Sequence, residues 1–121
     1  MKMVKKFVTK DSGKRQNYKS GMRRDLQDGK PRFDLIIPLN QPYTETLLYR
    51  WAMLMMRGYE KYGERNWEKA NSKEELNRFK QSAFRHFMQW LQNEEDEDHV
   101  AAVCYNLNAY EWLKEKLKNG K

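Results

Sequence analysis

Five consecutive acidic residues, followed directly by a histidine, form the stretch of this sequence that is best suited to chemistry. They occupy positions 94–98 and precede His99. Hard cations such as Mg²⁺ bind oxygen ligands, usually one or two carboxylates together with substrate phosphates, so this run predicts a divalent-metal site for phosphate chemistry. The structural alternative is that acidic residues at a helix start are stabilised by the helix dipole, by ~0.3–1 kcal/mol each, which explains one or two of them.

Helices are the elements that must position this acidic run, because apolar residues recur at every third or fourth position on both sides of it. The first helix is expected to begin between positions 40 and 42 and to end at Gly63. The second begins at Ser72, the start of a capping box, and extends to about position 92. The third runs from about 96 to 117. The predicted fold is therefore all-α, a small domain of about three main helices with an irregular basic N-terminal segment.

The apolar faces of these helices predict which side chains are buried. On the second helix the buried face is expected to include Phe87, Trp90 and Leu91. His86 lies at the edge of that face, where a hydrogen-bonded structural histidine and a functional one both fit the sequence. On the third helix, Asn106 stands in a mostly apolar stretch and is expected to need a specific hydrogen-bond partner.

The composition describes one basic domain with an anionic partner. Its 121 residues suffice for a single core, and the net charge of +7 suits nucleic acid, a membrane surface or nucleotide phosphates. The single cysteine excludes an intramolecular disulfide, and no apolar run approaches the ~18 residues that a membrane helix needs. The sequence therefore predicts a reduced, cytoplasmic protein with no signal peptide and no membrane partner.

The N-terminal third is irregular and basic. Residues 1–20 are predicted to be a mobile basic arm, or at most a short strand that needs a partner, and residues 21–121 are predicted to be the folded domain. Glycines and prolines between positions 21 and 40 exclude a long helix there. Four cationic side chains of this loop either bind phosphate or simply belong to a solvent-exposed loop without partners. They are Arg23, Arg24, Lys30 and Arg32.

Four motifs resemble those of a known family, in the same order along the chain. RRDLQDGKPRFDLI (23–36), EKYGERNWEKA (60–70), SAFRHFMQWL (82–91) and DEDHVAAVCYN (96–106) are similar to motifs of the phage-associated dATP/dGTP diphosphohydrolases, relatives of the MazG-like nucleotide pyrophosphatases. The resemblance implies a MazG-like all-α fold, Mg²⁺ or Mn²⁺ as cofactor, and hydrolysis of a purine deoxynucleoside triphosphate to monophosphate and pyrophosphate. A phage-encoded protein of this kind would act in the host cell cytoplasm.

The resemblance and the chemistry of the reaction together imply roles for individual residues. Glu97 and Asp98 are the implied catalytic residues. The implied metal ligands are Glu94, Glu95, Glu97, Asp98 and His99. Substrate binding is implied for Arg23, Arg24, Lys30, Arg32, Lys61, Tyr62, Asn66, Trp67, Arg85, His86 and Asn106. The wider superfamily holds its metal with carboxylate pairs from two facing helices. Here both candidate pairs, Glu94 with Glu97 and Glu95 with Asp98, fall in one run. Glu60 or His86 would therefore have to supply the ligand from the second helix.

Two other functions fit the same sequence. One is a module that sequesters a nucleotide without turnover, and the other is an accessory protein that binds nucleic acid, although nucleic acid is not the expected partner. Three helices leave amphipathic surface uncovered, which predicts a homo-oligomer. Because neighbouring like charges oppose folding, neutralising Asp98 is expected to leave the melting temperature level or to raise it.

Overall fold

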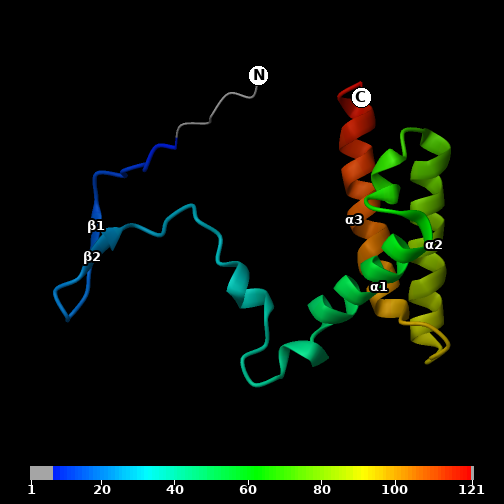
Figure 1. Ribbon diagram of the computed structural model, residues 1–121, viewed down its shortest axis with the longest axis horizontal. Helices are drawn as coiled ribbons and strands as arrows, with labels where there is room; N and C mark the ends of the chain where they lie inside the picture. Colours follow the sequence, from blue (N-terminus) through cyan, green and yellow to red (C-terminus); the bar gives the residue numbers. More distant parts are fainter. Residues whose placement is uncertain (1–6, 121) are drawn as a thin grey trace. The chain divides into compact units, whose positions relative to one another are not determined.

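The computed structural model describes residues 7–120 and contains two units, the first ending at Asp34 and the second beginning at Leu35. The first unit contains an antiparallel hairpin of β1 (Arg15–Asn17) and β2 (Arg23–Asp25), in which Gln16 pairs with Arg24 (Figure 1). The alternative prediction for residues 1–20 was a short strand that needs a partner. β1 is that strand, and β2 of the same unit is its partner. The predicted domain boundary after position 20 falls in the turn between the two strands.

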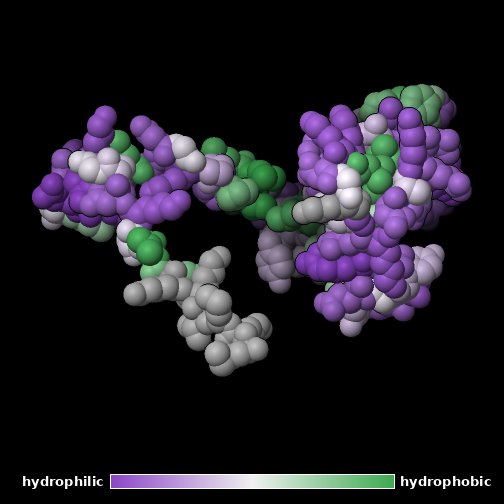
Figure 2. All heavy atoms as spheres, turned by 90° about the horizontal axis from the view of Figure 1, so that it is seen from above, coloured by the Kyte–Doolittle hydropathy of each residue, from purple (hydrophilic) through white to green (hydrophobic). Residues whose placement is uncertain are grey.

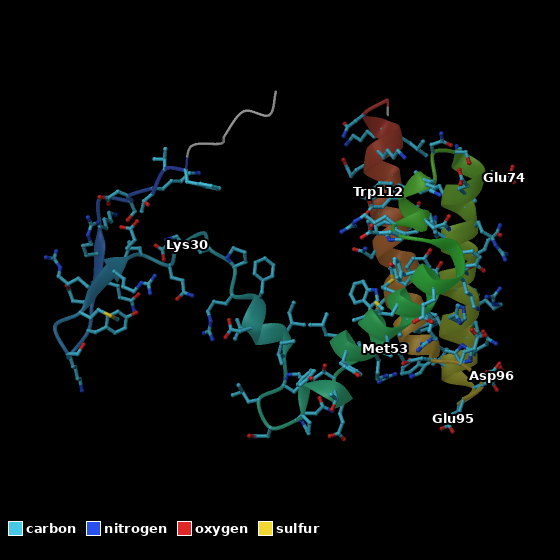
Figure 3. The ribbon with its side chains drawn as sticks, viewed as in Figure 1. Lys30, Met53, Glu74, Glu95, Asp96 and Trp112 are labelled. Carbon is cyan, nitrogen blue, oxygen red and sulfur yellow. The ribbon has the colours of Figure 1, made fainter. Side chains whose placement is uncertain are left out.

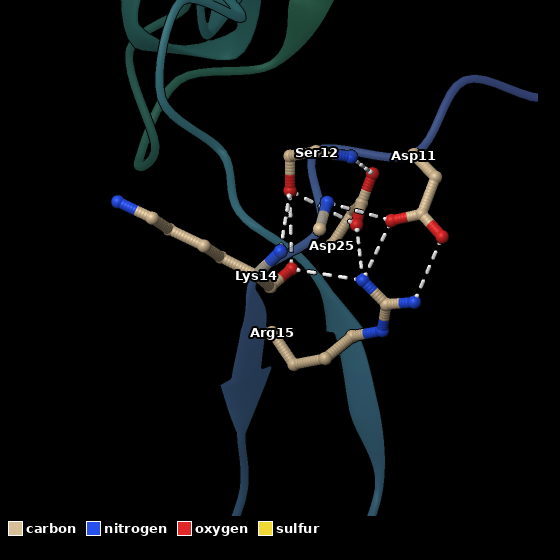
Figure 4. A network of polar contacts seen from close by, with 6 residues as sticks. Asp11, Ser12, Lys14, Arg15 and Asp25 are labelled. Atoms are coloured by element: carbon tan, nitrogen blue, oxygen red, sulfur yellow. Dashed lines mark hydrogen bonds and ion pairs between the residues drawn. The ribbon is translucent and has the colours of Figure 1, made fainter.

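Polar contacts close the open end of this hairpin (Figure 4). The Arg15 guanidinium donates to both carboxylate oxygens of Asp11, at 2.8 and 3.0 Å, and to Asp25 at 3.0 Å. The Ser12 hydroxyl donates to the Asp25 carboxylate at 3.1 Å. The hydrogen bond from Arg15 is the main reason why the pKa of Asp11 falls to about 2.

Three helices form the second unit: α1 (Leu47–Tyr62), α2 (Lys73–Leu91) and α3 (His99–Lys118). Short 3₁₀ turns occur at Phe33–Ile36, Tyr43–Glu45 and Asn66–Lys69, the last of which is labelled η3. α3 packs against both α2 and α1 (Figure 1). This arrangement confirms the prediction of a small, mostly helical domain. Within residues 7–120, no helix is both long and apolar enough to cross a membrane.

Side-chain caps determine where the helices begin. The Thr46 hydroxyl accepts a hydrogen bond from the backbone N–H of Tyr49 at 3.2 Å, so α1 begins after Thr46 and not at positions 40–42 as predicted. Ser72 caps α2 as predicted. Asp98 caps α3 by accepting from the backbone N–H of Ala101 at 3.1 Å, so this helix begins three residues later than the predicted position 96.

The most deeply buried positions of the second unit are small side chains of α3. Ala101 and Ala109 are 0% exposed, and Leu113 is the largest side chain that is fully buried. Alanine carries no bulky side chain, so the neighbouring helices can approach α3 closely. Asn106, on the same helix, is also buried and donates from its side chain to the carbonyl oxygen of Ala102 at 2.8 Å, which supplies the specific partner expected for it.

The predicted buried face of α2 is wrong in its C-terminal half. Phe87, Trp90 and Leu91 are between 44% and 49% exposed, whereas His86 is only 6% exposed. The physical reason is that α2 carries apolar residues on more than one face, and the face that turns to α3 is the one where His86 meets His99. Hydrophobicity alone does not distinguish these faces, because a polar pair occupies the interior.

Candidate functional site

The acidic run forms the turn between α2 and α3. After α2 ends, Asn93 adopts a left-handed backbone with φ of 60°, which reverses the direction of the chain. Glu95 and Asp96 project from this turn at one end of the helix pair, and Trp112 lies toward the other end (Figure 3). Asp98 is the carboxylate that caps α3. Helix capping therefore explains one of the carboxylates and leaves the others for another role.

One group of the run gathers around His99. Ligand atoms of Glu94, Asp96 and His99 all lie within 4.8 Å of one another. Asp96 Oδ1 lies 2.8 Å from His99 Nε2, and this hydrogen bond is the main reason why the pKa of Asp96 is lowered. Gln89 donates from its amide nitrogen to Glu94 at 3.2 Å, and its own Oε1 is buried without a hydrogen-bond partner among the residues that the structure describes.

Asp98 turns away from this group toward α1. Arg50 donates to its two carboxylate oxygens through Nε at 2.8 Å and Nη2 at 2.7 Å. The hydrogen bond from Arg50 is the main cause of the lowered pKa of Asp98, and burial opposes it. Arg50 was not predicted from the sequence, because 48 residues separate it from Asp98 and no local pattern connects them.

His86 and His99 form a buried pair between α2 and α3. Their exposed fractions are 6% and 3%, and their Nδ1 atoms lie 2.8 Å apart. On the outer side of His86, Arg85 Nη2 lies 3.2 Å from Nε2. Burial is the main cause of the lowered pKa of His86, and the charge of Arg85 acts in the same direction. The environment therefore favours the neutral imidazole of His86.

A pocket of about 660 Å³ lies where the C-terminal half of α1 meets η3 (Asn66–Lys69), with Glu97 and Tyr105 also in its wall. Its volume is typical of small-molecule sites. Trp67 packs edge-on against Trp112, with ring centroids 5.1 Å apart, and against Tyr105 at 6.5 Å. The indole ring is thereby fixed on α3, whereas Tyr62 is 64% exposed at the pocket.

The pocket brings together predicted residues from two separate motifs. Lys61, Tyr62, Asn66 and Trp67 come from the segment after α1, and Glu97 comes from the acidic turn. The lining also includes residues that were not predicted as site residues, among them Arg57, Arg65 and Tyr105. Arg57 stands four residues before Lys61 on α1, and this spacing, which places two side chains on one helix face, could have identified it.

Three other predicted substrate-binding residues belong to α2 and α3 and do not line the pocket. Arg85 and His86 belong to the histidine pair on α2, and Asn106 donates within α3. The four basic residues of the N-terminal loop belong to the first unit, where Arg23 and Arg24 lie in β2 and Arg32 pairs with Asp34 at 2.6 Å. Their role in binding phosphate stays a prediction, as does that of Lys30.

The predicted metal ligands are divided in this structure. Glu94 and His99 belong to the group around His99, together with Asp96, which was not predicted as a ligand. The other three predicted ligands lie outside that group. Glu95 is an exposed residue of the turn, Glu97 lines the pocket, and Asp98 pairs with Arg50.

The donor set around His99 fits a divalent cation. Two carboxylates and one imidazole converge there, and the amide nitrogen of Gln89 donates to Glu94. Carboxylates suit both Mg²⁺ and Mn²⁺, while an imidazole nitrogen is a softer donor that Mg²⁺, which prefers oxygen, uses less readily.

Comparison with known proteins identifies the family. The family model for the N-terminal region of dATP/dGTP diphosphohydrolases matches residues 20–120. No curated protein matches the chain, and neither does any solved structure. The matched residues include all three helices, the acidic turn and the pocket, and the match confirms the resemblance found in the sequence motifs. The chain belongs to the dATP/dGTP diphosphohydrolase family.

Proposed function

We propose that this chain hydrolyses dATP or dGTP to the nucleoside monophosphate and pyrophosphate, with Mg²⁺ or Mn²⁺ as cofactor. The observation that carries this proposal is the pocket, in which the cationic and aromatic residues after α1 meet Glu97 of the acidic turn. The family match supports the same reaction. A pocket of about 660 Å³ is large enough for a nucleotide.

The aromatic side of the pocket suits the purine base. Tyr62 is 64% exposed and free to stack, whereas Trp67 is fixed by its contacts with α3. Stacking on an aromatic side chain contributes ~1–3 kcal/mol per base. The amide of Asn66 offers both a donor and an acceptor for the edge of the base.

The cationic side of the pocket suits the triphosphate. Arg57, Lys61 and Arg65 all line it, the first two on α1 and the third just before η3. Cleavage between the α- and β-phosphates builds negative charge on the leaving pyrophosphate, and fixed cations stabilise that charge. The planar guanidinium of Arg57 is suited to bind two phosphate oxygens at once.

Glu97 is the proposed catalytic base. Its carboxylate is exposed in the pocket wall, where a water molecule attacking the α-phosphate would need to lose a proton. Glu94, Asp96 and His99 are the proposed cation ligands, and a cation bound there would neutralise phosphate charge and lower the pKa of water. Asp98, bound to Arg50 in this structure, is proposed to hold α3 against α1.

One observation favours a second function, a module that sequesters a nucleotide without turnover. Asp98 was predicted to be catalytic, yet both of its carboxylate oxygens are bonded to Arg50. Glu97 is likewise outside the group around His99. If the carboxylates do not gather on the substrate, the pocket binds a nucleotide but does not cleave it.

The proposed assembly is a homo-oligomer that covers an apolar face of α2. Phe84, Phe87, Met88 and Leu91 recur at three- and four-residue steps and are between 42% and 68% exposed. Hydrophobic atoms also appear as patches among hydrophilic ones on the visible surface of the helical unit (Figure 2). A second copy of the same chain can cover such a face by presenting the identical surface.

Binding of α,β-methylene-dATP, which resists cleavage at the proposed bond, tests the pocket. Tyr62→Ala should weaken binding roughly 5- to 150-fold in titration calorimetry, the equivalent of ~1–3 kcal/mol of lost stacking. Tyr43→Ala is the matched control, because Tyr43 is 72% exposed and does not line the pocket. Equal affinities of the two variants would show that the base binds elsewhere.

A further inference from the structure

A continuous hydrogen-bonded chain runs through the interior between α2 and α3. It connects the exposed guanidinium of Arg85 to His86, His86 to His99, and His99 to Asp96, with distances of 3.2, 2.8 and 2.8 Å. We propose that His86 is a positioning residue that fixes the proton of His99, and that Arg85 sets the direction of the whole chain. The role of this chain at a cation site rests on the proposed function.

The direction follows from the donors available. Arginine has only donor hydrogens, so Nε2 of His86 accepts from Arg85. The proton of a neutral His86 is therefore on Nδ1, and it is donated to Nδ1 of His99. His99 in turn carries its proton on Nε2 and donates it to Asp96. Each imidazole nitrogen then has a partner of the opposite kind.

The reverse direction is unfavourable in this structure. A proton on Nε2 of His86 would face the Arg85 guanidinium, which is also a donor. An unprotonated Nε2 of His99 would face the Asp96 carboxylate, which is also an acceptor. With His86 and His99 only 6% and 3% exposed, water has little access to relieve either mismatch.

The chain has a consequence for cation binding at His99. A nitrogen that binds a cation carries no proton, and Nε2 is the nitrogen of His99 that faces Asp96. His99 would then carry its proton on Nδ1 and His86 on Nε2, so the pair holds two protons in either arrangement. Arg85 could no longer donate to His86. Arg85 therefore competes with a cation at His99, and once released it is an exposed guanidinium suited to phosphate.

Nitrogen NMR of the ¹⁵N-labelled full chain, without metal or nucleotide, tests the direction. The expected spectrum has His86 protonated on Nδ1 and His99 on Nε2. In His86→Asn the amide nitrogen takes the place of Nδ1, so His99 should keep its proton on Nε2. In His86→Ala only the Asp96 carboxylate still favours the proton on Nε2, so a minor tautomer of His99 with its proton on Nδ1 should appear. A parent spectrum with His86 protonated on Nε2, or an unchanged His99 in the alanine variant, would overturn the proposal.

Arg85→Met keeps the buried pair and tests the competition, even if His86→Ala does not fold. Losing one hydrogen bond that opposes the cation should tighten Mn²⁺ binding about fivefold in calorimetry. Arg78→Met, on an exposed site of α2, is the control for net charge. An equal increase of Mn²⁺ affinity in Arg85→Met and Arg78→Met, or no Mn²⁺ binding at all, would contradict the proposed competition between Arg85 and the cation. Because the NMR test needs no nucleotide, the direction of the chain can fail or stand independently of the proposed hydrolysis.

Discussion

The ion pair between Arg50 and Asp98 is the contact whose removal is best defined by the structure. Asp98→Asn separates its two roles, because asparagine caps a helix about as well as aspartate but does not pair with arginine. The side chains of Arg50 and Asp98 are 44% and 20% exposed, so the freed guanidinium can be solvated and no buried charge remains. Two hydrogen bonds at this exposure contribute roughly 1 kcal/mol.

Unfolding of the metal-free protein measures this contribution. Asp98→Asn should lower the free energy of unfolding by roughly 1 kcal/mol, or the melting temperature by roughly 3–6 °C for a domain of this size. Asp98→Ala also removes the cap and should lower the free energy by about 1 kcal/mol more. This expectation replaces the one from sequence, in which removing a charge from the acidic run leaves the melting temperature level or raises it.

A double-mutant cycle decides between the two expectations. Arg50→Gln alone should destabilise by roughly 1 kcal/mol, and the double variant with Asp98→Asn should be little worse than either single variant, because both remove the same contact. If the two effects add without coupling, or if Asp98→Asn is as stable as the parent, the ion pair contributes nothing and the account of Asp98 as a residue that joins α1 to α3 is refuted.

The roles of Glu97, Phe84 and Asp11 can each be tested by one variant or titration. Glu97→Gln should lower turnover of dATP by ~10²-fold or more while the melting temperature is unchanged, and Glu111→Gln, an exposed site on α3, should do neither. Phe84→Glu should reduce the mass found by light scattering to that of the monomer; a parent that is already monomeric would contradict the proposed α2 interface. The Asp11 carboxyl should titrate in NMR with a pKa of about 2, compared with its ordinary 3.8. Its contact with Arg15 therefore stabilises the hairpin fully above pH 3.8, and this stabilisation is lost as the pH falls through about 2. A midpoint of 3.8 would show that this contact is absent.

The helices could be predicted from the sequence because their signals are local. Ser72 begins one helix and Gly63 ends another through contacts within a few residues, and the structure confirms both. The start of α1 was predicted wrongly because positions 40–42 also offer plausible caps. Thr46 is the cap in the structure, because residues 43–45 form a separate 3₁₀ turn before it. The start of α3 was missed because acidic residues before a helix all resemble caps, and only Asp98 reaches the backbone N–H of Ala101.

The candidate site could be predicted only in part, because its contacts are distant in sequence. The acidic run and the segment after α1 were both recognised, yet no spacing shows that Glu97 meets the pocket while Asp98 meets Arg50. A hydrogen-bonded structural histidine was one of the alternatives for His86, but its partner His99 was not predicted. This pairing offsets the loss of water that normally excludes a polar side chain from an interior. Hydrophobic periodicity carries no information about such a pair.

Product analysis tests the proposed hydrolysis most directly. The parent protein is incubated separately with dATP and dGTP, in the presence of Mn²⁺, of Mg²⁺ or of neither, and the products are separated by anion-exchange chromatography. The account predicts equal amounts of nucleoside monophosphate and pyrophosphate with either cation and none without. Nucleotide that is bound but recovered intact with both cations, or release of orthophosphate in place of pyrophosphate, would contradict it.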